Sequence, residues 1–116
     1  MEGYRELKVW QKGMDLVVAV YPLTATFPKS ETFGLASQMQ RAAVSVPSNI
    51  AEGNALRQTK AYLRHLSIAS GSLAELETQL EIAERLGYST DCSIATQANE
   101  IGRMLSILRK NLEAKL

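Results

Sequence analysis

Apolar residues recur at steps of three and four along most of the chain, the spacing that places side chains on one face of a helix. The regularity is greatest in the second half. A predicted helix from about Lys60 to Leu86 carries two apolar heptad positions, one with Tyr62, Ala69, Leu76 and Ala83 and the other with Leu66, Leu73 and Leu80. A last helix begins after Thr90 and Asp91, with an apolar seam of Ile94, Ala98, Ile101, Leu105, Leu108 and Leu112.

The first half of the chain predicts two further amphipathic helices. One runs from about Tyr4 to Ala25, and its expected seam consists of Leu7, Trp10, Met14, Val17 and Tyr21. Further apolar residues widen this face, so the helix is expected to meet more than one neighbour. The second helix follows a predicted cap at Ser30, and its apolar face consists of Leu35, Met39, Ala42, Val46 and Ile50.

Pro47 lies inside the pattern of the second helix. It has no N–H to donate to the carbonyl of Ala43, and its ring pushes that carbonyl away, so we predict a kink there. Asn49 and the neighbouring serines carry polar groups that can bond the freed backbone atoms. Gly53 is predicted to end the helix in the left-handed conformation. We interpret Pro47, Asn49 and Gly53 as residues of structure and assembly.

Gly71 and Ser72 place two small side chains in the middle of the third helix, where glycine costs about 1 kcal/mol in helix propensity. Small residues allow another helix to approach closely. Further apolar residues of this helix lie outside its seam, namely Leu63, Ile68, Ile82 and Leu86. They imply a second contact surface that faces another subunit, so we expect a homo-oligomer with Gly71 and Ser72 among its assembly residues.

Three short links join the predicted helices, at Phe27–Ser30, Gly53–Thr59 and Gly87–Asp91, with Thr59 as the expected cap of the third helix. Short links make consecutive amphipathic helices antiparallel neighbours. The sequence therefore predicts an all-α protein with a single domain over residues 1–116. Its expected architecture is an antiparallel up-down-up-down four-helix bundle whose second helix is kinked at Pro47.

Composition limits the possible partners. The chain has 13 basic and 12 acidic residues and a formal net charge of +1, so no overall field draws it to a polyanion or an anionic membrane. Binding to nucleic acid requires a local patch or its repetition in an oligomer. The N-terminus does not have the architecture of a signal peptide. The longest apolar run, Leu16 to Leu23, is shorter than the roughly 20 residues that span a bilayer. We expect a cytoplasmic protein without a membrane role.

Residues that carry catalytic or cofactor chemistry are sparse. With one cysteine, Cys92, and one histidine, His65, the chain lacks the parts for an intramolecular disulfide, a histidine metal cage or a Ser-His-Asp triad. Its glycines do not form a phosphate-binding loop. Carboxylate pairs such as Glu75 and Glu77 are typical of a solvated helix face. We therefore expect no enzymatic activity, cofactor, metal or small-molecule substrate.

Two sets of basic residues are candidates for contact with nucleic acid. Each set has the spacing i, i+3, i+7 of a strip on one helix face: Arg57, Lys60 and Arg64 where the third helix begins, and Arg5, Lys8 and Lys12 on the first. Such strips suit sequence-independent contacts with phosphate. The strip on the third helix lacks the interleaved aromatic residues of a base-stacking platform.

Two blocks of sequence resemble a known family. The first is the run from Arg41 to Gly53, preceded by Leu7-x-Val9-Trp10-Gln11 and Phe27-Pro28. The second runs from His65 to Leu80 and is followed by Leu86-Gly87-Tyr88. Together they resemble the bacterial four helix bundle protein family, also called the ribosomal-RNA intervening-sequence proteins. That family is related to the accessory proteins of diversity-generating retroelements.

The resemblance implies an antiparallel four-helix bundle that assembles into a homopentameric ring, which would multiply each basic strip. The retroelement relatives use basic ring surfaces to engage a reverse transcriptase and nucleic acid. The intervening-sequence members are named for genes found within ribosomal RNA. Two hypotheses follow. The chain is a non-enzymatic, ring-forming bundle that binds structured RNA or a nucleoprotein partner, or it is a protein-interaction scaffold with no nucleic-acid role.

Overall fold

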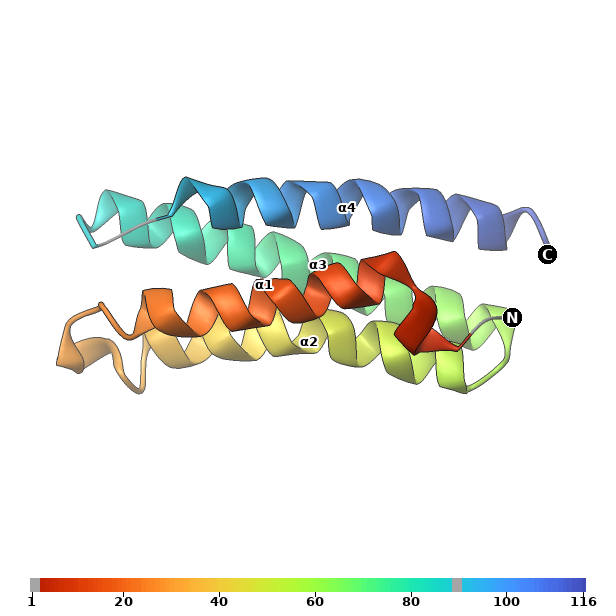
Figure 1. Ribbon diagram of the computed structural model, residues 1–116, viewed down its shortest axis with the longest axis horizontal. Helices are drawn as coiled ribbons and strands as arrows, with labels where there is room; N and C mark the ends of the chain where they lie inside the picture. Colours follow the sequence, from red (N-terminus) through yellow and green to blue (C-terminus); the bar gives the residue numbers. More distant parts are fainter. Residues whose placement is uncertain (1–2, 89–90) are drawn as a thin grey trace.

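The computed structural model describes residues 3–88 and 91–116. Four helices make up most of it: α1 (Lys8–Thr24), α2 (Leu35–Ala55), α3 (Thr59–Arg85) and α4 (Cys92–Glu113). Short 3₁₀ turns, η1 (Tyr4–Glu6) and η2 (Lys29–Glu31), precede α1 and α2. The described residues contain no strand, and the predicted all-α four-helix bundle is confirmed (Figure 1).

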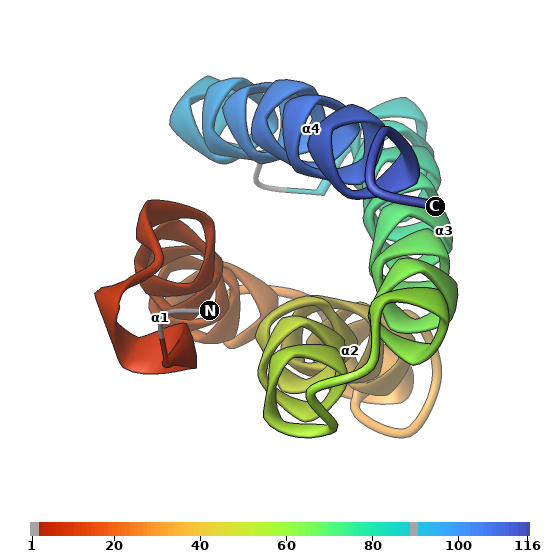
Figure 2. The same cartoon turned by 90° about the vertical axis from the view of Figure 1, so that its right-hand side faces the viewer.

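The helices lie along a molecule that measures 46 × 20 × 20 Å. Figure 1 shows successive connections at alternate ends, with the α2–α3 link at the same end as the N-terminal segment and the end of α4. Seen along the bundle, the helices follow one another around the axis in chain order (Figure 2). The contact between α2 and α3 is the most extensive of any pair. α2 and α3 therefore form the most tightly associated pair of helices in the bundle.

The predicted apolar faces of α2, α3 and α4 form the core. Their largest fully buried members include Met39, Ile50, Leu66, Leu76, Ile94, Ile101 and Leu105. The seam predicted for α1 was right only in part. Leu7, Trp10 and Val17 pack against the core, but Met14 and Tyr21 are 42% and 46% exposed. The buried apolar side chains of α1 are instead Val9, Leu16, Val20 and Leu23. Gly13 accounts for this rotation, since a Cβ there would lie 3.3 Å from Cβ of Pro47, so this side of α1 is held against α2.

α1 begins later than the predicted Tyr4. The chain first makes the turn η1 and then extends at Leu7, with φ −76° and ψ 124°. The side-chain amide of Gln11 donates to the carbonyl of Arg5 at 2.9 Å, which holds the turn against the first turn of α1. This break folds η1 back toward α1 instead of continuing the helix axis.

The predicted cap of α2 at Ser30 was also wrong, because Ser30 lies in η2 and α2 starts at Leu35. Glu31 takes over the capping function. Its Oε1 accepts the backbone N–H of Leu35 at 3.2 Å, and its Oε2 accepts the hydroxyl of Tyr88 at 2.7 Å. These donors hold the pKa of Glu31 below its ordinary value. One carboxylate thus ties the start of α2 to the segment after α3.

α2 continues through Pro47 and ends at Ala55, so the prediction that Gly53 stops the helix was wrong. Gly53 is buried, and a Cβ there would lie 2.7 Å from Cβ of His65 and 3.1 Å from Cδ1 of Tyr62. Gly53 therefore permits a close approach of α2 to α3. The kink at Pro47 stays a prediction.

α3 starts one residue earlier than predicted, and the residue before it, Gln58, takes the cap position instead of Thr59. Its end is as predicted, because Gly87 follows in the left-handed region with φ 79°. α4 is capped by Asp91, whose Oδ1 accepts the N–H of Ser93 at 2.9 Å and whose pKa is lowered by that bond. The expected contribution of Thr90 lies outside the described residues.

Candidate nucleic-acid interface

Five of the six basic residues predicted to contact nucleic acid lie at one end of the bundle, where the N-terminal segment meets the α2–α3 link (Figure 1). They come from four segments: Arg5 in η1, Lys8 at the start of α1, Arg57 in the link, and Lys60 and Arg64 on α3. All five are exposed. We call this the basic end. The fold therefore joins two sets of residues that the sequence placed on separate helices.

Arg57 differs from the position that its spacing predicted. It precedes the first residue of α3 and adopts φ 56°, so it is not part of the helix face that carries Lys60 and Arg64. An L-residue in this left-handed region costs about 1–2 kcal/mol relative to the right-handed one. Arg57 is the one non-glycine residue with positive φ in the part of the chain that the structure describes. The link is thus strained at a basic residue.

Arg5 lies against two aromatic rings. Its Cζ is 5.4 Å from the ring centroid of Tyr4 and 5.8 Å from that of Trp10, within the range of a cation–π contact. The two rings meet edge to face, with centroids 5.3 Å apart. The basic end therefore contains the aromatic residues that the strip on α3 lacks.

Sequence reasoning assigned Trp10 to the core-facing seam of a continuous first helix and did not consider Tyr4 as a site residue. In a continuous helix, residues six apart do not share a face. The 3₁₀ turn and the extended Leu7 bring Tyr4 back over Trp10. The interruption of the helix brings Tyr4, Arg5 and Trp10 together. The apolar periodicity of the sequence does not predict this interruption.

A hollow of about 310 Å³ lies between η1 and the end of α2. Its lining residues are Gly3, Tyr4, Arg5, Glu6, Asn54, Ala55 and Arg57. The floor is firm, because Asn54 is only 1% exposed and donates to the hydroxyl of Tyr62 at 3.4 Å. Arg5 and Arg57, from the two predicted strips, thus share one concave site.

Lys12 lies apart from the other five basic residues. Its Nζ is 3.0 Å from Oε1 of Glu100, an ion pair that joins α1 to α4. Asp15 and Gln97 line the same small hollow beside it. Because a carboxylate already faces Lys12, we expect it to contribute less to binding of an anion than Arg5 or Lys8.

A series of polar bonds crosses the α2–α3 contact behind the basic end. Nδ2 of Asn49 donates to the carbonyl of Ser45 at 2.9 Å, so its Oδ1 faces Nδ1 of His65 at 3.0 Å. Since Oδ1 can only accept, Nδ1 of His65 carries the proton. Oε2 of Glu52 lies 3.4 Å from the same nitrogen. At the other end of the series, the hydroxyls of Ser45 and Ser72 are 2.7 Å apart.

The residues predicted to serve assembly therefore lie in two settings. Pro47 and Gly53 are buried within the bundle, and Asn49 and Ser72 bond across its α2–α3 contact. Gly71 is exposed, and a Cβ there would meet no atom within 4 Å. Contacts within one chain therefore account for the positions of Pro47, Gly53, Asn49 and Ser72. The role of Gly71 in assembly stays a prediction.

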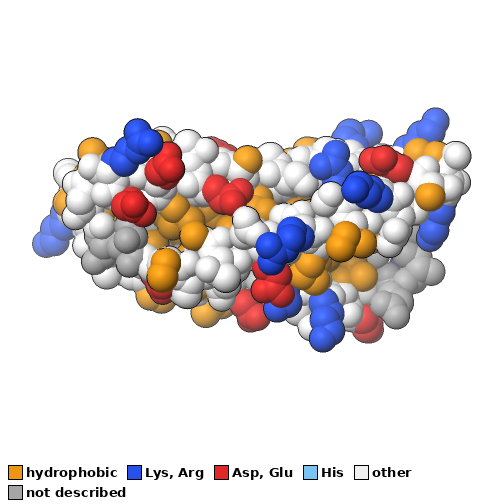
Figure 3. Space-filling model, turned by 90° about the horizontal axis from the view of Figure 1, so that it is seen from above, with side chains coloured by type: hydrophobic (Ala, Val, Ile, Leu, Met, Phe, Trp, Pro, Cys, Tyr) orange, Lys and Arg blue, Asp and Glu red, His pale blue; other side chains and the backbone are white. Residues whose placement is uncertain are grey.

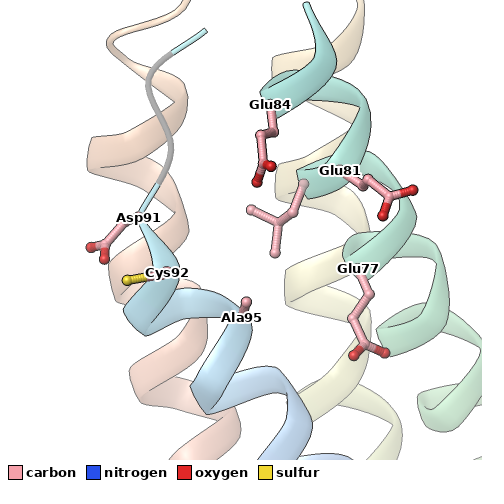
Figure 4. A pocket seen from close by; sticks show the side chains of 7 residues that line it. Glu77, Glu81, Glu84, Asp91, Cys92 and Ala95 are labelled. Atoms are coloured by element: carbon pink, nitrogen blue, oxygen red, sulfur yellow. The ribbon is translucent and has the colours of Figure 1, made fainter. Parts of the chain in front are cut away.

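The opposite end of the bundle holds an acidic hollow of about 300 Å³ between α3 and α4. It is lined by Glu77, Leu80, Glu81, Glu84, Asp91, Cys92 and Ala95. Figure 4 shows that the carboxylates do not converge, since Glu81 points away from the gap and Asp91 points away from α3. Among residues 3–88 and 91–116, no three His, Cys, Asp or Glu side chains are placed to hold a metal ion.

None of the described helices contains a stretch long and apolar enough to cross a membrane. Basic side chains gather toward one end of the surface. In Figure 3 most of the lysine and arginine side chains on the face shown lie over the half that contains the basic end.

Comparison with known proteins covers most of the bundle. Residues 5–109 match the family described as 23S rRNA-intervening sequence protein. The chain is also similar to a crystal structure of a protein with unknown function from the S23 ribosomal protein family of Bacteroides thetaiotaomicron. The two are 25% identical with a TM-score of 0.80, over 88% of this chain and 95% of that chain. The comparison with curated proteins found no match. The resemblance seen in the sequence is confirmed: this chain belongs to the family of 23S rRNA-intervening sequence proteins.

Proposed function

We propose that this protein is a non-enzymatic bundle that binds structured RNA, or a nucleoprotein that contains it, through its basic end. The observation that carries the proposal is the convergence of Arg5, Lys8, Arg57, Lys60 and Arg64 at one end of the molecule. Lys110 and Lys115, close to the C-terminus, belong to the same end of the bundle. Clustered cations of this kind bind phosphate and release condensed counterions.

Charge segregation supports this role despite the small net charge. α3 carries Lys60 and Arg64 in its first turns, and its second half carries Glu75, Glu77, Glu81 and Glu84. Of the basic residues near that second half, Arg85 lies 3.5 Å from Glu81. The field at the basic end therefore differs from what a charge of +1, spread evenly, would produce.

The family supplies independent support. Its description names the 23S rRNA, and the similar crystal structure belongs to a family named for a ribosomal protein. The first name refers to ribosomal RNA and the second to a ribosomal protein. We extend that context to this protein as an RNA ligand and to the cytoplasm as the place where it acts.

We further propose that the protein acts as a homo-oligomeric ring, a homopentamer by resemblance, which would repeat the basic end around its axis. Apolar side chains left on the outer face of α1 and α2 support self-association. Val18 is 69% exposed, and Tyr21 and Val44 line a groove of about 530 Å³ between the two helices. Burying such side chains between copies would remove apolar surface from water.

The test is binding of a structured RNA over a series of salt concentrations, with light scattering on the same samples to give their mass. The variant changes Arg57, Lys60 and Arg64 to Gln. The matched control changes Lys29, Arg41 and Arg85 to Gln, which removes the same charge outside the basic end. We expect wild type and control to bind with a steep salt dependence, and the basic-end variant to bind more weakly with a shallower slope.

A protein-interaction scaffold is the second candidate, favoured by the amount of exposed apolar surface. Phe33 is 96% exposed, and Ile68 and Ile82 lie on the outer face of α3 at 46% and 43%. If an intact oligomer of wild-type protein does not bind RNA at low salt, the RNA proposal is wrong and the scaffold is favoured. If the basic-end variant and the matched control lose the same amount of RNA binding, the basic end is not the binding site.

A further inference from the structure

We infer that the hollow at the basic end binds one unpaired nucleotide of an RNA, with its base stacked on the cluster of Tyr4, Arg5 and Trp10 and its phosphate held by Arg57. The inference rests on the proposed function and deepens it, because it names a single-stranded segment as the ligand. A contact with the backbone of a duplex would not require aromatic residues.

The cluster provides the stacking surface. Unpaired RNA bases stack on aromatic rings and on guanidinium planes, and Arg5 presents such a plane next to both rings, 5.4 Å from Tyr4 and 5.8 Å from Trp10. Tyr4 and Arg5 line the hollow, while Trp10 supports them from α1. The hollow, at about 310 Å³, lies at the lower end of the roughly 300–1,000 Å³ of ligand pockets, which suits a single nucleotide.

Arg57 provides the phosphate contact. It lines the same hollow as Arg5, and a guanidinium matches the geometry of phosphate oxygens with two parallel hydrogen bonds. Its positive φ is a local strain of the kind that concentrates at ligand sites. Lys60 and Arg64 follow it at exposed positions one turn apart on α3, where they can contact the next phosphates of the strand.

Glu6 is the acidic residue among those that line the hollow, and its carboxylate disfavours a simple inorganic anion as the ligand. A carboxylate repels a bare phosphate or sulfate, but it accepts hydrogen bonds from the N–H groups on the edge of a base. The hollow therefore combines a stacking surface, two guanidinium groups and a carboxylate acceptor. That set fits a nucleotide better than an inorganic anion.

The site is also preformed. Asn54 forms part of the floor, is 1% exposed and donates to the hydroxyl of Tyr62. The adjacent Gly53 lets α3 pack tightly beneath it. A rigid floor lowers the cost of ordering the site when the ligand binds.

The chain contains a single tryptophan, so its fluorescence reports on this site. The experiment titrates the full-length protein with a short single-stranded RNA and, separately, with the perfectly paired duplex of the same strand. We expect the single strand to change Trp10 fluorescence and to bind more tightly than the duplex. Tyr4→Leu should weaken binding of the single strand at least about fivefold, the effect of losing one stacked base.

Two further variants separate stacking from folding. Tyr4→Phe keeps the ring and should bind as wild type does. Phe33→Leu removes a 96% exposed aromatic ring in the link before α2, at the opposite end of the bundle, and should have no effect. Circular dichroism and melting confirm that each variant is folded. If Tyr4→Leu melts early, Arg5→Lys takes its place, because it keeps the charge and removes the planar group.

The outcomes distinguish the inference from the proposed function. Equal binding of duplex and single strand, with no change in Trp10 fluorescence but with sensitivity to the Arg57, Lys60 and Arg64 changes, overturns the inference and leaves the proposed function intact. Absence of binding to either RNA overturns both. Weaker binding by Tyr4→Leu that Tyr4→Phe restores supports the inference.

Discussion

The two ends of this bundle are built from similar helices and carry opposite chemistry. At the basic end, α2 and α3 approach closely at Gly53, and the aromatic ring of Tyr4 lines a hollow together with Arg5 and Arg57. At the other end, α3 and α4 leave an acidic hollow whose carboxylates point in different directions (Figure 4). The first hollow combines two guanidinium groups with an aromatic ring, whereas the second is lined mainly by carboxylates.

This difference shows why net charge is a poor guide to the partners of the protein. A formal charge of +1 on 116 residues suggests no affinity for a polyanion. The charges are instead sorted along a molecule 46 Å long, more than the roughly 10 Å over which salt screens exposed charges. Each end therefore presents its own field to a ligand.

The largest expected effect tests this sorting directly. Changing Arg57, Lys60 and Arg64 to Gln shifts the formal charge from +1 to −2, and changing Glu77, Glu81 and Glu84 to Gln shifts it from +1 to +4. If the local field governs binding, the first variant lowers the salt slope on duplex RNA by about 2.7, at about 0.9 per phosphate contact, and the second hardly changes it. If the two variants change the salt slope by equal amounts in opposite directions, net charge governs binding.

The packing of the basic end is tested by a pair of glycines. Gly53→Ala places a Cβ 2.7 Å from Cβ of His65, so we expect a loss of about 1–3 kcal/mol in the free energy of unfolding. Gly71→Ala meets no neighbouring atom and should stabilise α3 by up to about 1 kcal/mol. Denaturant unfolding measures both. A neutral Gly53→Ala would mean that the two helices can separate at no cost.

The polar series between α2 and α3 should have a smaller effect. Asn49→Ala removes the acceptor at 3.0 Å from Nδ1 of His65 and the donor to Ser45, and we expect a loss of about 1 kcal/mol. Thr78→Ala is the control, since its hydroxyl bonds only its own helix and is exposed. A double-mutant cycle with His65→Ala gives the coupling energy, and a value near zero would show that the bond does not contribute.

The smallest expected effect is the pH dependence of stability that Glu31 contributes, at the end of the bundle opposite the basic end. The pKa of Glu31 is lowered from 4.5 in the folded protein, so its contribution to stability is complete above 4.5 and is lost as the pH falls through the lowered value. Glu31→Gln should therefore lower the melting temperature slightly at neutral pH, and the difference from wild type should shrink in acid. Melting curves across this range test the prediction. If the difference in melting temperature between Glu31→Gln and wild type instead grows in acid, the pKa of Glu31 is not lowered by folding.

The sequence predicted α2, α3 and α4 well because each has one dominant apolar face. Met39, Leu73 and Ile101 follow the expected periodicity and are buried. α1 has apolar residues around much of its circumference, so periodicity alone could not fix its rotation. Gly13 against Pro47 fixes it, and that contact depends on two helices at once.

The candidate site was predicted only in part, for a related reason. Arg5, Arg57 and Lys60 were identified from their charge and spacing, but their convergence depends on where the bundle brings the N-terminus and the α2–α3 link together. Tyr4 and Trp10 were missed because a 3₁₀ turn interrupts the expected helix. The helix caps predicted at Ser30 and Thr59 were wrong. α2 begins only at Leu35, whose N–H is accepted by Glu31, and Gln58 occupies the cap position of α3.

The polar series from Glu52 to Ser72 has a consequence for register. Apolar helix faces tolerate sliding by one turn, about 5.4 Å, because one leucine can replace another in the contact. The pairs Ser45–Ser72 and Asn49–His65 cannot be exchanged in this way, and neither can the glycine at 53, which admits only the stretch around Tyr62. These residues permit one alignment of α2 and α3, and that alignment fixes where the link and its arginine stand relative to the N-terminal turn.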